Sequence, residues 1–240
     1  MILFWCGPVQ ASTMKRAAWR GTPPRVLTLN AGVNGAISSA AFGELGALFK
    51  STGGTALRGA LLAANLPADT TEPIALAGFS AGFAVMEAML VDAADRARIV
   101  AVGAFDAYYT SAAKSVKPGY AAFAKLALAG ERQMTMTSSH VAGKDYPSGF
   151  DAASAFVAPL KLAPIPRRNI GPAVCDHAEG RGSFRWYVYA DRDSPKTSHA
   201  QNATVIAPVI MPELVGGGAA KSSGGGEVLL LAAAAVVLLS

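Results

Sequence analysis

Three residues far apart in the chain carry the groups that acyl transfer by a serine requires. Ser80 lies in Gly78-Phe79-Ser80-Ala81-Gly82, Asp106 follows an apolar run at 98–105, and His199 ends the polar loop after 184–189. A serine hydroxyl attacks a carbonyl when an imidazole takes its proton and a carboxylate holds that imidazole in the right tautomer. The chain order Ser, Asp, His is that of one known solution. The pattern therefore predicts a triad of Ser80, His199 and Asp106.

The serine sits in a segment with the form of a nucleophile elbow. An apolar run at 74–77 leads into Gly78-Phe79-Ser80-Ala81-Gly82, and a helical pattern begins directly after it. Such a strand-to-helix turn holds the serine in a strained, exposed position. Both glycine positions need small residues, because the strand and helix backbones approach too closely there for a Cβ atom. We therefore expect Ser80 at the carboxyl end of a buried strand.

The rest of the chain alternates apolar runs with helical patterns. We expect strands at 2–5 (at a sheet edge), 25–30, 74–77, 98–105, 133–137 and 184–189. We expect helices after the elbow and at 36–50, 55–65, 118–130, 151–157 and 200–214, and an irregular surface segment at 158–183. This alternation predicts an α/β protein with three layers (α/β/α) and a mainly parallel sheet of about five or six strands. In such a sheet, the functional crevice lies at the carboxyl ends of the strands.

These features together resemble the α/β-hydrolase superfamily, in a reduced form, over roughly residues 25–214. More narrowly, residues 102–109 and 129–137 are similar to small α/β-hydrolase-like proteins of bacteria and their phages. The resemblance implies that Ser80 is the nucleophile, that His199 acts as base and then acid, and that Asp106 orients His199. It also implies an oxyanion hole formed by the backbone N–H of Ala81 and one from Ala31 or Gly32.

The sequence departs from the usual family pattern in its acid and its oxyanion loop. The acid usually follows the next strand, which here ends in Ser138-Ser139-His140, so Asp145 and Asp151 remain alternative acids. Asn30-Ala31-Gly32 stands where a His-Gly-Gly motif is common. The chain is also short for the family.

Further side chains are candidates for contacts with substrate. His140 follows a predicted strand, where it would contact substrate or replace His199 as the base. The pocket wall would contain Phe79, Tyr108 and Tyr109, which favour an apolar or acyl substrate.

Composition bounds the remaining function classes. The 240 residues, 52% of them hydrophobic and 15% charged, are typical of one compact globular domain. The net charge of +5 is spread along the chain, which favours a solvated surface over nucleic-acid binding. Cys6 and Cys175 match no metal spacing and are expected as free thiols or one disulfide. His177 follows Cys175 and Asp176, but this run lacks further ligands, so we expect no metal and no cofactor.

The C-terminal part differs from the rest. We expect the domain to span 1–215, with a Gly-rich linker at 216–227 and an apolar tail at 228–240. The tail is shorter than the ~20 residues of a spanning helix, and would pack on the domain, associate with a membrane or contact another copy. The N-terminal residues lack the features of a signal peptide, so the cytoplasm is the default location.

The leading hypothesis is a serine hydrolase acting on carboxylic esters, in the manner of an esterase or lipase, through an acyl-serine intermediate. A peptidase or amidase would use the same triad. A third interpretation, of another class, is a catalytically silent α/β-hydrolase-like module that serves as a structural or interaction protein.

Overall fold

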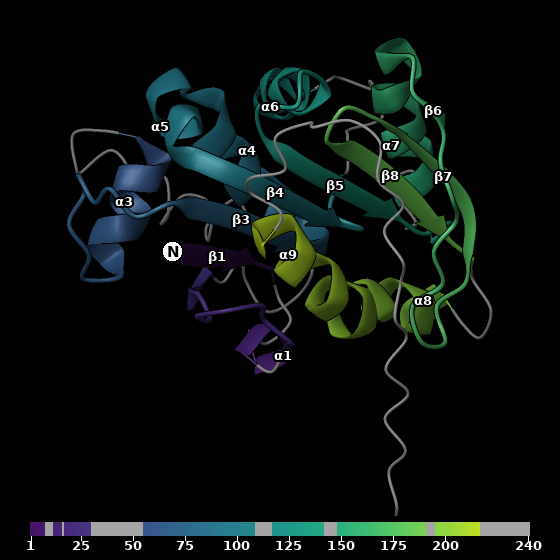
Figure 1. The fold of residues 1–240 in the computed structure, drawn as a ribbon, viewed down its shortest axis with the longest axis horizontal. Helices are drawn as coiled ribbons and strands as arrows, with labels where there is room; N and C mark the ends of the chain where they lie inside the picture. The colour runs from purple at the N-terminus through teal and green to yellow at the C-terminus, as the bar shows by residue number, and fades with distance from the viewer. Residues whose placement is uncertain are drawn as a thin grey trace, which may run out of the picture.

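The protein has an eight-stranded, mostly parallel sheet in the order β2-β1-β3-β4-β5-β8-β7-β6 (Figure 1). This computed structural model describes residues 1–7, 12–15, 17–29, 55–108, 117–141, 148–190 and 195–216. The strands from β2 to β8 in that order are parallel, whereas β7 and β6 are antiparallel to their neighbours. Their bounds are β1 Ile2–Cys6, β2 Arg25–Leu29, β3 Ile74–Phe79, β4 Ile99–Phe105, β5 Gln133–Ser138, β6 Ala163–Pro164, β7 Cys175–Arg181 and β8 Phe184–Tyr189. The α/β class is as predicted, but the sheet is larger than the five or six strands expected.

The first strand lies inside the sheet. The prediction of an edge strand is wrong, because β1 pairs with β2 on one side and with β3 on the other. All five residues of β1 are buried. A run with no polar residue suits a strand that is covered on both faces.

Helices cover both faces of this sheet (Figure 1). Alternate residues of β1 belong to two separate hydrophobic clusters, Phe4 and Cys6 to one and Leu3 and Trp5 to the other, as the two-residue period of a strand requires. On the first side lie α3 (Ala56–Ala63), α4 (Phe83–Val91), α5 (Ala93–Arg98), α6 (Pro118–Leu128) and α7 (Gly149–Val157). On the second lie α1 (Ser12–Lys15) and α9 (Ala207–Gly216).

Helix starts follow local capping chemistry. Thr55 caps α3, where its hydroxyl accepts a hydrogen bond from the backbone N–H of Arg58, as the sequence predicts. The cap of α7 is Ser148, whose Oγ accepts from the Asp151 N–H at 3.0 Å. Asp151 therefore belongs to the first turn of α7, which begins at Gly149, two residues before the predicted 151–157. The predicted helix at 36–50 lies outside the described residues.

The segment 158–183 is not irregular, contrary to expectation. It contains a 3-10 turn, η2 (Ala158–Leu160), and the strands β6 and β7. β7 forms a hairpin with β8, with a register shift between Cys175 and His177. Its polar sequence and this shift conceal the two-residue period by which a half-buried strand is recognised.

The last helical region begins at residue 195, before the predicted 200–214. α8 (Pro195–Gln201), a π-helical turn η3 (Asn202–Ile206) and α9 follow one another without a break. Pro208 comes just after the π turn. Because proline lacks an N–H and crowds the carbonyl four residues earlier, a wider turn at that point accommodates it.

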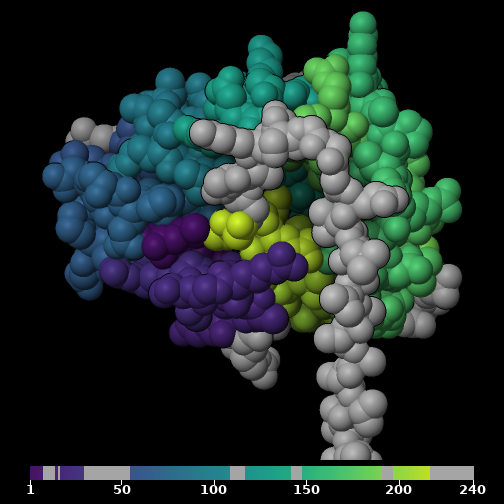
Figure 2. Space-filling model, in the orientation of Figure 1, coloured from purple at the N-terminus to yellow at the C-terminus, as the bar shows by residue number. Residues whose placement is uncertain are grey.

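The two ends of the described chain lie together. Figure 2 shows the N-terminal segment beside the C-terminal helix, and Met1, Trp19 and Arg20 share a small hollow with Pro212 and Val215. Most of the expected linker and all of the tail at 228–240 lie outside the described residues. Among the described helices, none is both long enough and apolar enough to cross a membrane.

Candidate active site

Ser80 lies at a sharp turn between β3 and a short 3-10 helix, η1 (Ser80–Gly82), which leads into α4. Its φ of 52° is in the left-handed region, which non-glycine residues seldom adopt and which is typical of functional turns. A Cβ atom on Gly78 would lie 2.0 Å from Met86 Sδ, and one on Gly82 would lie 1.9 Å from the carbonyl oxygen of Cys6. The turn therefore depends on both glycines for close packing.

Asp106 follows β4, the strand next to β3, and its side chain is fully buried. Its carbonyl oxygen accepts a hydrogen bond from the Ser80 N–H at 3.2 Å, which ties the two strand ends together. Its carboxylate accepts from the N–H of Ser139 at 3.0 Å and from the Ser139 hydroxyl. A Cβ atom on Gly149 would lie 2.1 Å from Asp106 Oδ1, so the start of α7 also confines the carboxylate.

His199 lies on α8, and its imidazole is directed at Asp106. The distance from His199 Nδ1 to Asp106 Oδ2 is 2.6 Å. Because the carboxylate accepts, Nδ1 carries the proton, and Nε2 is the nitrogen left to act as a base. The ring also packs against Phe79, with centroids 4.5 Å apart, and Phe79 immediately precedes Ser80.

In the described part of the chain, no hydrogen bond joins Ser80 Oγ to His199. Such contacts are often long without substrate and shorten when it binds. The structure thus brings Asp106 and His199 into direct contact, and brings the imidazole to the residue beside Ser80.

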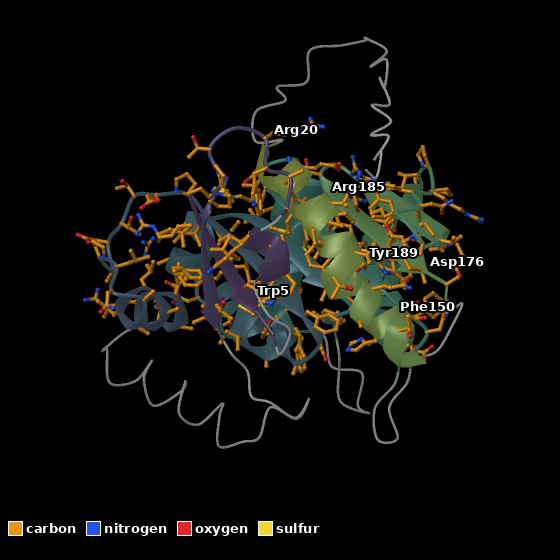
Figure 3. All side chains as sticks on the ribbon, turned by 90° about the horizontal axis from the view of Figure 1, so that it is seen from below. Trp5, Arg20, Phe150, Asp176, Arg185 and Tyr189 are labelled. Atoms are coloured by element: carbon orange, nitrogen blue, oxygen red, sulfur yellow. The ribbon has the colours of Figure 1, made fainter. Side chains whose placement is uncertain are left out.

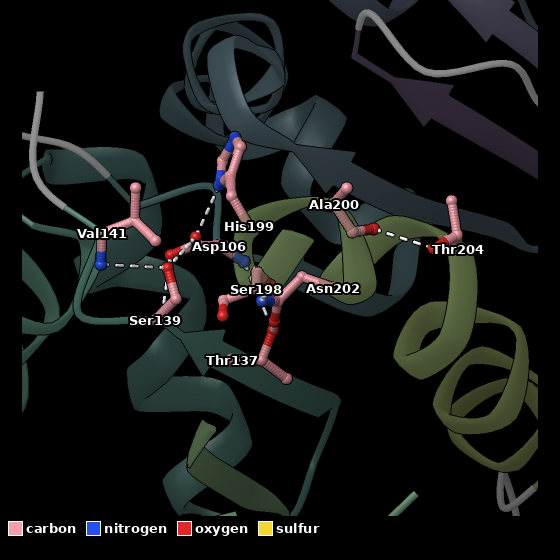
Figure 4. A network of polar contacts seen from close by, with 9 residues as sticks. All are labelled: Asp106, Thr137, Ser139, Val141, Ser198, His199, Ala200, Asn202 and Thr204. Atoms are coloured by element: carbon pink, nitrogen blue, oxygen red, sulfur yellow. Dashed lines mark hydrogen bonds and ion pairs between the residues drawn. The ribbon is translucent and has the colours of Figure 1, made fainter. Parts of the chain in front are cut away.

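A buried polar network holds α8 against the sheet (Figure 4). The Thr137 hydroxyl accepts from the Asp106 N–H at 3.3 Å and donates to Asn202 Oδ1. Asn202 Nδ2 in turn donates to the Ser198 carbonyl oxygen at 3.2 Å. Because Asn202 lies three residues after His199, this network fixes the segment that carries the imidazole.

Ser139, Thr137 and Asn202 were not identified from the sequence. Each is a neutral polar residue of a common type, and no motif marks it. The one signal in the sequence is the polar end of β5, Ser138-Ser139-His140, and it does not indicate a role for Ser139.

The alternative acids have other positions. Asp151 Oδ2 accepts from the Ser148 hydroxyl at 2.7 Å, so its carboxylate serves the first turn of α7. Asp145 lies outside the described residues.

The oxyanion donors are only partly described. Ala81 is the second residue of η1, and the first N–H groups of a helix have no partner within it. Ala31 and Gly32 lie outside the described residues. They follow β2, which pairs with β1 and not with β3. The strand beside β3 is β1, and a Cβ atom on Gly82 would lie 3.1 Å from the Gly7 nitrogen.

The expected pocket residues separate into two environments. Phe79 contacts His199, as described, whereas Tyr108 is only 2% exposed and packs between Tyr120 and Phe156 in the core. Burial raises the pKa of the Tyr108 hydroxyl to about 12. Tyr109 lies outside the described residues.

His140 lines a separate cavity of about 460 Å³ beside β7 and α7. Its Nε2 lies 3.5 Å from Asp176 Oδ2, and no described contact joins it to Ser80 or Asp106. His177 contacts Glu179. Among the described residues, no group of three His, Cys, Asp or Glu side chains could hold a metal. Cys6 and Cys175 are buried free thiols, and they belong to the opposite hydrophobic clusters.

Compared with known proteins, the chain matches no family model, no curated protein and no solved structure.

Proposed function

We propose that this protein is a serine hydrolase of the α/β-hydrolase type that acts on carboxylic esters. One observation carries the proposal. The imidazole of His199 lies 2.6 Å from the buried carboxylate of Asp106 and packs on Phe79, the residue before a serine in the left-handed conformation. Ser80 and Asp106 lie at the carboxyl ends of β3 and β4, which are neighbouring parallel strands, and this is where such sheets carry their sites.

The chemistry would run in two steps. As Ser80 Oγ attacks the ester carbonyl, its proton passes to His199 Nε2, and Asp106 stabilises the resulting imidazolium through Nδ1. The tetrahedral oxyanion is met by the Ala81 N–H and a second backbone donor. The C–O bond to the alcohol then breaks, and His199 returns its proton to the leaving oxygen. Water repeats the sequence on the acyl-serine, which releases the acid and restores Ser80.

The surroundings of Asp106 support its role as the orienting carboxylate. A fully buried carboxylate is costly unless hydrogen bonds satisfy it. Ser139 provides two donors and His199 a third. This arrangement leaves the carboxylate no freedom to rotate away from the imidazole, so His199 is held in the tautomer that the reaction needs.

Covalent labelling tests the proposal directly. A fluorophosphonate probe should label the wild-type protein, and the label should map to Ser80. Ser80→Ala should abolish labelling and lower hydrolysis of p-nitrophenyl esters by at least about 10⁴-fold, with an unchanged circular dichroism spectrum.

Ser183→Ala is the matched control, because Ser183 lies between β7 and β8, outside the site. It should be labelled normally. A folded wild-type protein that takes no label would contradict the proposal and favour a silent module. A panel of matched esters and amides then tests the leaving group, and faster turnover of the amides would refute the ester assignment.

A further inference from the structure

The cavity beside β7 is built from side chains that the proposed triad does not use. Four rings follow one another along it, with centroid distances of 4.5 Å, 5.9 Å and 5.2 Å. A carboxylate contacts the histidine at each end of this row. The lining residues that matter here are His140, Phe150, Trp186, His177, Asp176 and Glu179. Figure 3 shows Phe150 and Asp176 on the same side of the molecule.

The charge of this cavity differs from that of the chain. The whole chain carries +5, yet the described residues that line the cavity include two carboxylates and neither Lys nor Arg. The Asp176 side chain is 42% exposed, and it contacts His140 through Oδ2, so this carboxylate is accessible to a donor on a ligand.

The cavity adjoins the acid of the triad through shared backbone. His140 directly follows Ser139, whose N–H and hydroxyl hold Asp106. The Phe150 N–H donates to the Ser139 carbonyl oxygen at 3.0 Å. Trp186 Nε1 donates to Ser138 Oγ at 3.0 Å. The wall of the cavity and the support of Asp106 are therefore the same segment of chain.

We propose that this cavity binds a primary ammonium group carried on an aromatic or aliphatic stem, and that this group is part of the ester substrate. The carboxylate of Asp176 accepts from the ammonium at one end of the row of rings, and the stem lies along the rings toward the end where Glu179 contacts His177. The second half of this inference rests on the proposed function, whereas the binding of the cation does not. The excess of carboxylates disfavours an anion, and the described side chains provide no three-ligand set for a metal.

Binding is tested with benzylammonium as the probe and benzyl alcohol as its neutral counterpart. Titration into the full-length Ser80→Ala protein, followed by calorimetry, removes turnover from the measurement. Benzylammonium should bind at least about tenfold more tightly than benzyl alcohol, because a hydrogen bond to a charged group is stronger than one between neutral groups. Equal affinities, or no binding of either probe, would overturn the proposal.

Variants locate the binding to the cavity. Asp176→Asn should weaken benzylammonium binding by about tenfold, and Glu179→Gln, at the other end of the row, should weaken it less. Asp69→Asn and Glu131→Gln make the same chemical changes at exposed positions outside the cavity and should leave the affinity unchanged. If all four variants weaken binding equally, the effect is one of overall charge and the site is wrong.

The link to substrate is tested by kinetics. Wild-type kcat/KM should be about tenfold higher for p-nitrophenyl 6-aminohexanoate than for p-nitrophenyl hexanoate, by the same interaction. In Asp176→Asn this ratio should fall toward one. The same comparison is made with a pair of esters that carry the cation in the alcohol part. If the wild-type ratio of kcat/KM values is one for both pairs, the cation is not part of the substrate. If the wild-type protein hydrolyses none of these esters, the proposed function is refuted, while the binding experiment still tests the cation site.

Discussion

At the scale of single residues, Asp106 lies after β4, one strand before the usual position of the acid in α/β-hydrolases, and its carboxylate still reaches His199. Its backbone follows β4, and its carboxylate is directed toward α8 and the end of β5. The position after β5, where α/β-hydrolases usually have their acid, is occupied here by Ser139. Ser139 contributes two donors to Asp106, so the polar end of β5 supports the acid without supplying it.

Asp106→Asn is expected to lower kcat by about 10⁴-fold with little change in KM. The amide keeps the size of the side chain, but it cannot stabilise an imidazolium and does not hold the Nδ1–H tautomer. Steady-state kinetics on a p-nitrophenyl ester measure the effect.

Asp151→Asn is the matched control, since Asp151 was the alternative acid and its carboxylate lies at the start of α7. It should keep nearly full activity. If the two variants lose activity equally, Asp106 is not the orienting acid.

The sequence predicts charged and nucleophilic candidates better than it predicts their neutral supports. Two glycines and a strand–helix pattern mark Ser80 as a candidate, and His199 is a candidate because the chain has only three histidines. Ser139 and Asn202 have no such mark. Their importance arises from contacts that join residues 33 and 65 positions apart along the chain.

At the scale of elements, the helix that carries His199 is held by a buried amide in the turn that follows it. Asn202 lies in the π turn after α8 and is fully buried. It accepts from Thr137 on β5 and donates to Ser198. The register of α8 against the sheet, and hence the place of the imidazole, depends on these contacts.

Asn202→Ala is expected to lower the free energy of unfolding by about 2–3 kcal/mol, because the Thr137 hydroxyl loses its buried acceptor and a cavity remains. It should also lower kcat, since His199 is no longer fixed. Urea denaturation and ester kinetics measure the two effects.

Thr204→Ala is a control within the same turn. The Thr204 hydroxyl donates to the Ala200 carbonyl oxygen at 3.0 Å, at an exposed position, so the change in stability should stay within about 0.5 kcal/mol. A similar loss in both variants would mean that the π turn itself, and not the Asn202 network, holds α8.

The strand that could not be predicted from the sequence, β7, is the one that lines the cavity beside it. β7 carries Asp176, His177 and Glu179, residues that seldom occur together in a strand. β8, which is aromatic and β-branched, was predicted correctly. Local propensity fails at β7 because pairing with β8 determines its structure.

At the scale of the whole molecule, the sequence predicts the alternation of strands and helices but not the order of the strands. Neither the placement of β1 between β2 and β3 nor the hairpin of β7 and β8 can be deduced from spacing. This difference matters for the site. It places Gly7, at the end of β1, beside Gly82 of the elbow, whereas the predicted donors Ala31 and Gly32 lie outside the described residues.

Because β1 lies inside the sheet and carries a buried thiol, the stability of the whole protein should fall at alkaline pH. Cys6 is completely buried where β1 packs under the elbow, and burial raises the pKa of its thiol from 9.0 to about 12. Because the unfolded chain releases this proton near pH 9 and the folded chain holds it, the contribution is complete below pH 9. It is lost as the pH rises from 9 toward 12. Burial also raises the pKa of Tyr120, and this adds to the loss at high pH.

The free energy of unfolding should therefore fall above pH 9, and the Cys6 thiol should account for about 1.4 kcal/mol per pH unit of that slope. Urea denaturation of wild type and Cys6→Ala between pH 7 and pH 11 measures it. The variant is expected to be less stable at pH 7, because a smaller side chain leaves a cavity, but its stability should decline less steeply above pH 9. Between pH 7 and pH 8.5 the two curves should run parallel, and curves that stay parallel to pH 11 would show that the Cys6 thiol is not held neutral by the fold.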